Sequence, residues 1–99
     1  MLEKSIMIVN AVLDPNEKEA FALYSERSGP LFKNVGAKPI SKYKVAQNIV
    51  GDKKLQVVAI MEFPSKKAIL DVFESEAYKE LLPLRAKAFT ELEVFIGKE

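Results

Sequence analysis

Apolar positions in four segments of the chain follow the pattern of β-strands. Residues 5–13 and 55–63 are apolar at nearly every position and rich in β-branched side chains, which predicts two central strands. Residues 37–49 alternate more loosely and carry several lysines, which favours an edge strand because charged side chains discourage edge-to-edge pairing. Leu92, Val94, Phe95 and Ile96 predict a last strand, which ends at Gly97.

A first helix is predicted between the first two strands, where apolar side chains recur at helical spacing. Residues 14–17 (Asp-Pro-Asn-Glu) indicate its start, with Asp14 as N-cap and a proline in the first helical position. Pro30 lacks a backbone N–H, so the helix is expected to kink or restart at Gly29-Pro30. Gly36 suits the position just after its end.

A second helical region is predicted after Pro64, which stops the strand before it. Ser65 suits an N-cap, and Ser75 suits the N-cap of a further helical stretch that extends to Phe89. Pro83 is expected to break or bend this stretch.

The order is therefore strand, helix, strand, strand, helix, strand, with a turn predicted at residues 51–54. Two split βαβ units in 99 residues predict one α+β domain over residues 1–99. The expected fold is ferredoxin-like, βαββαβ, with a four-stranded antiparallel sheet and helices on one face.

Both faces of the predicted central strands are apolar. In residues 5–13, Ile6, Ile8 and Val12 share one face, whereas Met7, Val9, Ala11 and Leu13 share the other. Two helices can cover only one face, and a large exposed apolar face usually marks an interaction surface. We therefore expect a homodimer that pairs through its sheet faces.

Composition excludes several kinds of chemistry. The chain has neither His nor Cys, which removes the commonest ligands of transition metals and haem, so no metal and no other cofactor is expected. A net charge of +1 gives no reason to expect nucleic acid or an anionic membrane as a partner. The apolar runs are too short to span a bilayer, and the first residues lack the apolar region of a signal peptide, so we expect a cytoplasmic protein.

Several short motifs are shared with a known family. They are Glu62-Phe63-Pro64-Ser65, Ser75-Glu76-Ala77-Tyr78, Leu84-Arg85 and the last strand ending at Gly97, with Asp14-Pro15, Tyr24 and Gly29-Pro30 in the first half. With these motifs the chain resembles the domain of unknown function 1330 family, which belongs to the dimeric α/β-barrel superfamily. The resemblance implies a ferredoxin-like fold and a dimer. The family has no established reaction, and its relatives include cofactor-free monooxygenases, muconolactone-type isomerases, haem-degrading enzymes and chlorite-dismutase-like proteins.

Glu62 is the candidate general base. It ends a central strand on the face of Val58 and Ile60, and apolar surroundings make a carboxylate harder to ionise. The alternative is an acid at the end of a strand that pairs with an arginine or a lysine.

Four other residues are candidates for ligand binding. Tyr78 and Arg85 are seven positions apart, about two helical turns, and could present a phenol and a guanidinium to one carboxylate-bearing ligand. Tyr24 could line the mouth of the same cleft, and Asn10, an amide in an apolar strand, must find polar partners. Alternatively, Arg85 pairs with Glu62 or caps carbonyl groups, Tyr78 and Tyr24 pack at the edge of the core, and Asn10 lies in the dimer interface.

The resemblance implies a dimeric α/β-barrel protein, and the candidate residues predict that it binds a small organic ligand between its sheet and its helices. The protein could also be a cofactor-free enzyme, isomerase-like or monooxygenase-like, in which Glu62 is the base and Tyr78 and Arg85 orient the ligand. The alternatives are a ligand sensor without catalytic activity and a purely structural dimer. The sequence leaves open whether the protein is an enzyme.

Overall fold

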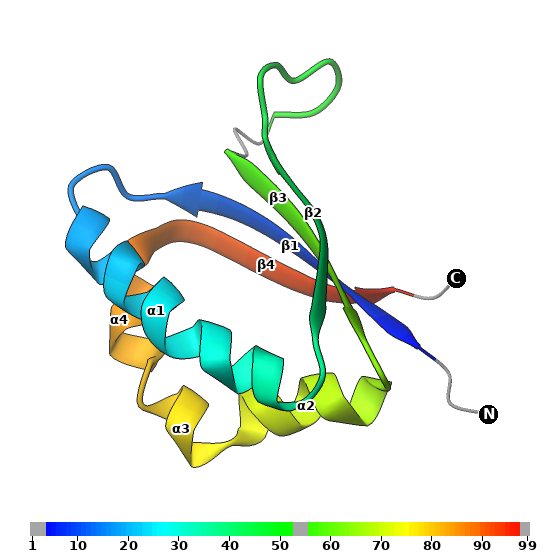
Figure 1. Cartoon of the computed structure of the whole chain (residues 1–99). Coiled ribbons are helices and arrows are strands. Elements are labelled where there is room, and N and C mark those ends of the chain that lie inside the picture. The colour runs from blue at the N-terminus through cyan, green and yellow to red at the C-terminus, as the bar shows by residue number, and fades with distance from the viewer. Residues whose placement is uncertain (1–3, 53–55, 98–99) are drawn as a thin grey trace.

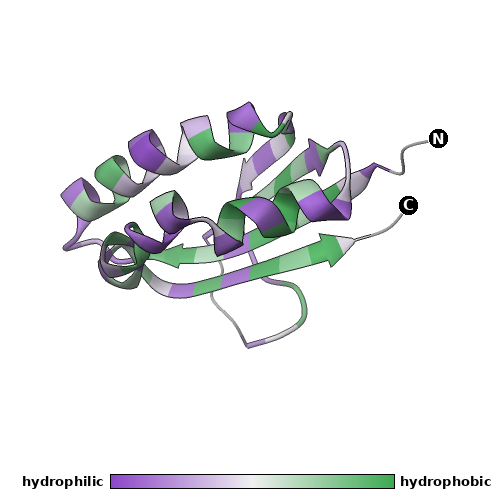
Figure 2. Ribbon diagram, turned by 90° about the horizontal axis from the view of Figure 1, so that it is seen from below, coloured by the Kyte–Doolittle hydropathy of each residue, from purple (hydrophilic) through white to green (hydrophobic). Residues whose placement is uncertain are grey.

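The computed structural model describes residues 4–52 and 56–97. Their elements are, in order, β1 (Ser5–Leu13), α1 (Lys18–Asn34), β2 (Lys38–Lys44), β3 (Val57–Phe63), α2 (Lys66–Glu74), α3 (Glu76–Lys79), α4 (Leu82–Ala88) and β4 (Phe89–Gly97). The strands form one antiparallel sheet in the order β2-β3-β1-β4, and the helices lie on one side of it (Figures 1 and 2). The predicted α+β, ferredoxin-like fold is confirmed.

The strands agree with the sequence prediction except at their ends. β1 has the predicted bounds, whereas β2 is shorter than residues 37–49. β3 begins at Val57; Leu55, where it was expected to begin, and the second half of the predicted turn at residues 51–54 lie outside the described residues. The prediction that Phe89 is helical is wrong, because its backbone is extended and it pairs with Leu13, which makes it the first residue of β4.

α1 begins later than predicted and ends where it was predicted to end, just before Gly36. Asp14 forms a turn instead of an N-cap, since its Oδ1 accepts a hydrogen bond from the Asn16 backbone N–H (2.9 Å), and the helix begins at Lys18. It then runs through Pro30 without a restart. Gly29 has no Cβ to clash with the ring of the proline that follows it, which makes this passage tolerable. The predicted role of Gly36 is confirmed, because its φ of +89° is one that glycine adopts easily.

The second helical region follows its capping residues. The Ser65 hydroxyl accepts a hydrogen bond from the Ala68 N–H at the start of α2, and the Ser75 hydroxyl accepts one from the Tyr78 N–H at the start of α3, both at 3.1 Å. Pro83 lies in the first turn of α4, where its missing N–H has no helical partner to lose. The predicted break is therefore confirmed.

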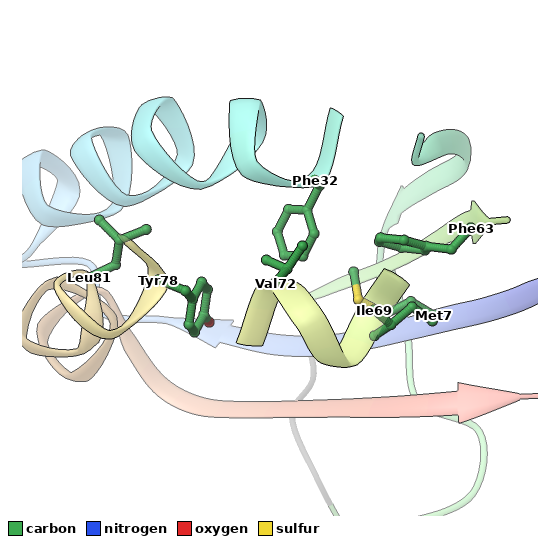
Figure 3. Close-up of a cluster of buried hydrophobic side chains, with 7 residues drawn as sticks. All are labelled: Met7, Phe32, Phe63, Ile69, Val72, Tyr78 and Leu81. Atoms are coloured by element: carbon green, nitrogen blue, oxygen red, sulfur yellow. The ribbon is translucent and has the colours of Figure 1, made fainter. Parts of the chain in front are cut away.

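The main core lies between the sheet and the helices. Odd-numbered side chains of β1 and β3 point toward the helices, and Met7, Ala11 and Phe63 among them are almost fully buried. The core cluster, shown in Figure 3, consists of Met7, Phe32, Phe63, Ile69, Val72, Tyr78 and Leu81.

We call the other side of the sheet the open face. Even-numbered side chains of β1 and β3 lie on it, and they are only partly buried in one chain. Its apolar members are Ile6, Ile8, Val12, Val58, Ile60 and, on β4, Phe95. No helix in the described ranges covers this face (Figure 2). None of the described helices is long and apolar enough to cross a membrane.

Candidate functional site

A cavity of about 250 Å³, which we call the α1 cavity, lies between the helix-facing side of the sheet and α1. The sheet contributes Met7, Val9, Ala11, Leu13, Lys42, Val57, Ala59, Met61, Phe89, Leu92 and Val94, and the helices contribute Phe21, Tyr24, Ser25, Ser28, Gly29, Phe32 and Phe73. The lining is mostly apolar. Gly29 and Ala59 have little or no side chain, which leaves space between α1 and the sheet.

Tyr24 connects the α1 cavity to a chain of polar groups. Its hydroxyl oxygen lies 2.7 Å from that of Tyr78, and Arg85 Nη1 donates to the Tyr78 hydroxyl at 3.3 Å. The guanidinium carbon of Arg85 also lies 5.7 Å from the centre of the Tyr78 ring, within the range of a cation–π contact. Three of the predicted ligand-binding residues therefore come together.

Their arrangement differs from the predicted one. Tyr78 is 1% exposed, so its phenol lies between Tyr24 and Arg85 and cannot face a ligand. Only Tyr24 lines the α1 cavity, whereas Arg85 lines a separate one. A single carboxylate held jointly by Tyr78 and Arg85 does not fit this geometry.

The surroundings of Tyr24 keep its phenol neutral. Burial is the largest cause that raises the pKa of Tyr24 far above its ordinary value of 10.0, and the proximity of Tyr78 raises it further. The nearby Arg85 charge offsets only a small part of this pKa shift. At neutral pH the Tyr24 side chain is therefore a hydroxyl, able to donate one hydrogen bond and to accept others.

Glu62 does not approach these residues. Helix-facing residues of β3 are odd-numbered, and Glu62 lies on the open face, between Ile6 and Lys38 in register. Its Oε1 lies 3.4 Å from Lys4 Nζ. The expected convergence of Glu62 with Tyr78 and Arg85 is wrong, and the pairing of Glu62 with a basic side chain, the alternative, is what the structure shows.

Asn10 also lies on the open face. It pairs in register with Val58 of β3 and Glu93 of β4 and is partly buried. Because it is separated from the α1 cavity by the sheet, Asn10 cannot contact a ligand there. The alternative, in which Asn10 lies in a dimer interface, stays a prediction.

Sequence reasoning missed several residues of the α1 cavity. Phe89 was assigned to a helix, yet its ring packs edge-on against Phe21 and Tyr24, with ring centres 5.8 and 5.4 Å apart. Ser28 lies four residues after Tyr24 on the same stripe of α1 and is buried. A serine within an apolar stripe was the one signal that could have indicated polar groups in the cleft.

The sheet order and the helices on one side of the sheet define the class of protein: an α+β protein with a ferredoxin-like fold. The chain belongs to the family described as Domain of unknown function (DUF1330), whose model matches residues 5–97. No curated protein matches it in sequence.

Solved structures from three organisms share this fold. A protein of unknown function from Rhodopseudomonas palustris is 24% identical, with a TM-score of 0.86 over 100% of this chain and 84% of that one. A proposed antibiotic biosynthesis monooxygenase from Nitrosomonas europaea is 16% identical, with a TM-score of 0.69 over 100% of this chain and 92% of that one. Hydroxynitrile lyase from Passiflora edulis is also 16% identical, with a TM-score of 0.69 over 98% of this chain and 94% of that one. At these identities the likeness concerns the fold alone.

Proposed function

We propose that the protein binds a small, largely apolar organic molecule in the α1 cavity, with a hydrogen-bond acceptor of that molecule at the Tyr24 hydroxyl. The observation that carries this proposal is an apolar cavity with a neutral phenol in its wall. Ligand sites are typically apolar with a few placed polar groups.

The size of the α1 cavity suits a ring-sized ligand. An engineered apolar cavity of about 150 Å³ stays dry and binds benzene. At about 250 Å³, the α1 cavity has room for a benzene ring that carries a small polar substituent.

The hydrogen-bond chain favours a ligand that accepts a hydrogen bond from Tyr24. Arg85 donates to the Tyr78 oxygen, so the Tyr78 proton is free to point at Tyr24. Either hydroxyl can donate across this 2.7 Å contact; when Tyr78 donates, the Tyr24 proton is directed to the cavity, and hydrogen bonds arranged in sequence strengthen one another. A carbonyl or another uncharged oxygen is the matching ligand group.

Polar groups of the cavity support binding more than proton abstraction. They are Tyr24, Ser25, Ser28 and Lys42, and none of the described residues lining the cavity is a carboxylate. A neutral phenol could stabilise a developing oxyanion, as enzymes of several folds do. Without a base beside it, this arrangement fits a ligand-binding protein better than an isomerase, and a cofactor-free enzyme is the second candidate.

A matched pair of probes tests this proposal. Acetophenone has a carbonyl acceptor, whereas ethylbenzene has a similar shape and none. Chemical shifts of the intact protein should move at Phe21, Ser28 and Ala59 with both probes. Tyr24→Phe should weaken the binding of acetophenone by about three- to tenfold, which is the usual contribution of one hydrogen bond to affinity. It should leave the binding of ethylbenzene unchanged.

Two further variants complete the design. Ala59→Phe, which fills the α1 cavity, should weaken the binding of both probes. Tyr43→Phe, on the exposed surface of β2, should change the binding of neither probe. If neither probe moves the cavity residues, or if Ala59→Phe binds both like the wild type, the proposal is wrong.

We also propose that a second copy of the chain covers the open face. The central strands are apolar on both faces, and the helices cover only one. The described part of the β2–β3 connection, residues 45–52, extends beyond the sheet on the side away from the helices (Figure 2). Its Ile49 and Val50 are 91% and 92% exposed, as expected for side chains that a partner would bury.

A further inference from the structure

A second cavity, which we call the β4 groove, opens beside the edge strand of the sheet. It has a volume of about 400 Å³ and lies between α2, α4 and β4. Apart from Arg85 its lining is apolar: Ile69, Leu70, Phe73, Leu92, Val94 and Ile96. Leu70, Val94 and Ile96 are 36–39% exposed, so a row of apolar side chains is left uncovered beside one cation.

Arg85 has hydrogen-bonding capacity that the described residues do not use. A guanidinium has five N–H donors, and here one of its nitrogens, Nη1, donates to the Tyr78 hydroxyl. Three ion pairs join described residues, Lys4 to Glu62, Lys67 to Asp71 and Lys79 to Glu76, and Arg85 takes part in none of these three. A half-buried charge beside apolar side chains is costly unless it is paired, so the half-buried Arg85 guanidinium favours an anionic partner.

We propose that the β4 groove binds a carboxylate attached to an apolar chain, with the carboxylate at Arg85 and the chain along Leu92, Val94 and Ile96. Arginine matches a carboxylate because two of its N–H groups can donate to the two oxygens in parallel. This inference goes beyond the proposed function, since it concerns a different cavity and a charged ligand. The two cavities are neighbours, because Phe73, Leu92 and Val94 line both.

Octanoate and octan-1-ol provide the test, because they have the same chain and differ in charge. Titration of the intact protein, followed by NMR, should show octanoate shifting Leu70, Ile96 and the Arg85 side-chain signal. Octan-1-ol should bind at least about tenfold more weakly, as expected when a charge-assisted hydrogen bond is lost. Added salt should weaken the binding of octanoate and leave the binding of octan-1-ol unchanged, because ions screen a partly exposed pair of guanidinium and carboxylate.

Variants on one helix separate the charge of Arg85 from other effects. Arg85→Gln should reduce octanoate binding about tenfold, to the level of octan-1-ol. Arg85→Lys should keep part of it, and Lys87→Gln, which removes the same charge from an exposed position of α4, should bind octanoate like the wild type.

Several results would overturn the inference. They are equal binding of octanoate and octan-1-ol by the wild type, octanoate shifts confined to the α1 cavity around Phe21 and Ser28, and no octanoate binding up to millimolar concentration. Each concerns the wild type, so the test does not depend on whether Arg85→Gln folds. Acetophenone binding in the α1 cavity is a separate readout, so the two proposals can fail independently.

Discussion

The hydroxyl oxygens of Tyr24 and Tyr78 lie 2.7 Å apart, although the residues are 54 positions apart in the chain. Tyr24 comes from the middle of α1 and Tyr78 from the short helix α3. Their rings also meet nearly edge to face, with centres 6.3 Å apart. This contact joins the two helical regions directly beside the α1 cavity and connects Tyr24 to Arg85.

Loss of the Tyr78 hydroxyl should destabilise the protein. Tyr78→Phe keeps the buried ring but removes the partner of both Tyr24 and Arg85. We expect the free energy of unfolding in urea to fall by about 1 kcal/mol. Tyr43→Phe removes the same atom from a side chain on the open face that is 63% exposed in one chain. In the Ile60→Lys background, in which the copies are expected to separate, it should change the free energy of unfolding by less than about 0.5 kcal/mol. Equal effects of the two variants would show that the Tyr78 hydroxyl makes no stabilising contact.

The burial of Tyr24 should make stability depend on alkaline pH. Folding raises the pKa of Tyr24, so above the ordinary pKa of 10.0 the unfolded chain loses a proton that the folded chain keeps. The contribution of Tyr24 to the free energy of unfolding is then fully present below about pH 10 and decreases as the pH rises above it.

Tyr24→Phe provides the comparison. Between about pH 9 and pH 11, the wild type should lose more stability in urea than the variant, because the variant has no proton to lose at this position. If the difference between the two proteins stays constant or grows in favour of the wild type over this range, the pKa of Tyr24 is not raised by folding.

Two neighbours on α2 should differ strongly in their importance for the core. Ile69 is 1% exposed within the core cluster, whereas Leu70 is 39% exposed at the β4 groove. Ile69→Ala should lower the free energy of unfolding by about 2–5 kcal/mol, because it leaves a cavity. Leu70→Ala should cost much less, since little of its surface is removed from water. Similar losses from both variants would contradict the described orientation of α2.

The proposed dimer can be tested from both sides of the sheet. Ile60→Lys places a charge at the centre of the open face, opposite Ile8, and should convert a dimer into a monomer at micromolar concentration by light scattering. Leu23→Lys, on the outer surface of α1, should leave the dimer intact. A wild type that is monomeric in this range, or a folded Ile60→Lys protein that still dimerises, would rule out pairing through the open face.

Local signals in the sequence predicted more of the fold than of the site. Ser65, Ser75 and Gly36 act through residues within a few positions of themselves, so their roles could be inferred from the chain alone. Glu62 shows how a site prediction failed. It was assigned to the face of Val58 and Ile60, and that alternation, followed consistently, already placed it on the side of the sheet away from Tyr78.

The remaining features depend on packing between distant segments. The Tyr24–Tyr78 contact requires α1 and α3 to meet, and no spacing in the sequence encodes that distance. Likewise, Phe89 follows a helical pattern in the sequence. It nevertheless belongs to β4, because it pairs with Leu13 and extends the ladder between β1 and β4. Tertiary pairing of this kind overrides local propensity.

The most direct test of the central claim is a crystal structure of the protein with acetophenone. The account predicts the ring of acetophenone in the α1 cavity, between Phe21 and Ala59, with its carbonyl oxygen at hydrogen-bond distance, about 2.5–3.0 Å, from the Tyr24 hydroxyl. An α1 cavity that holds no acetophenone in crystals saturated with it, or acetophenone whose oxygen points away from Tyr24, would contradict it.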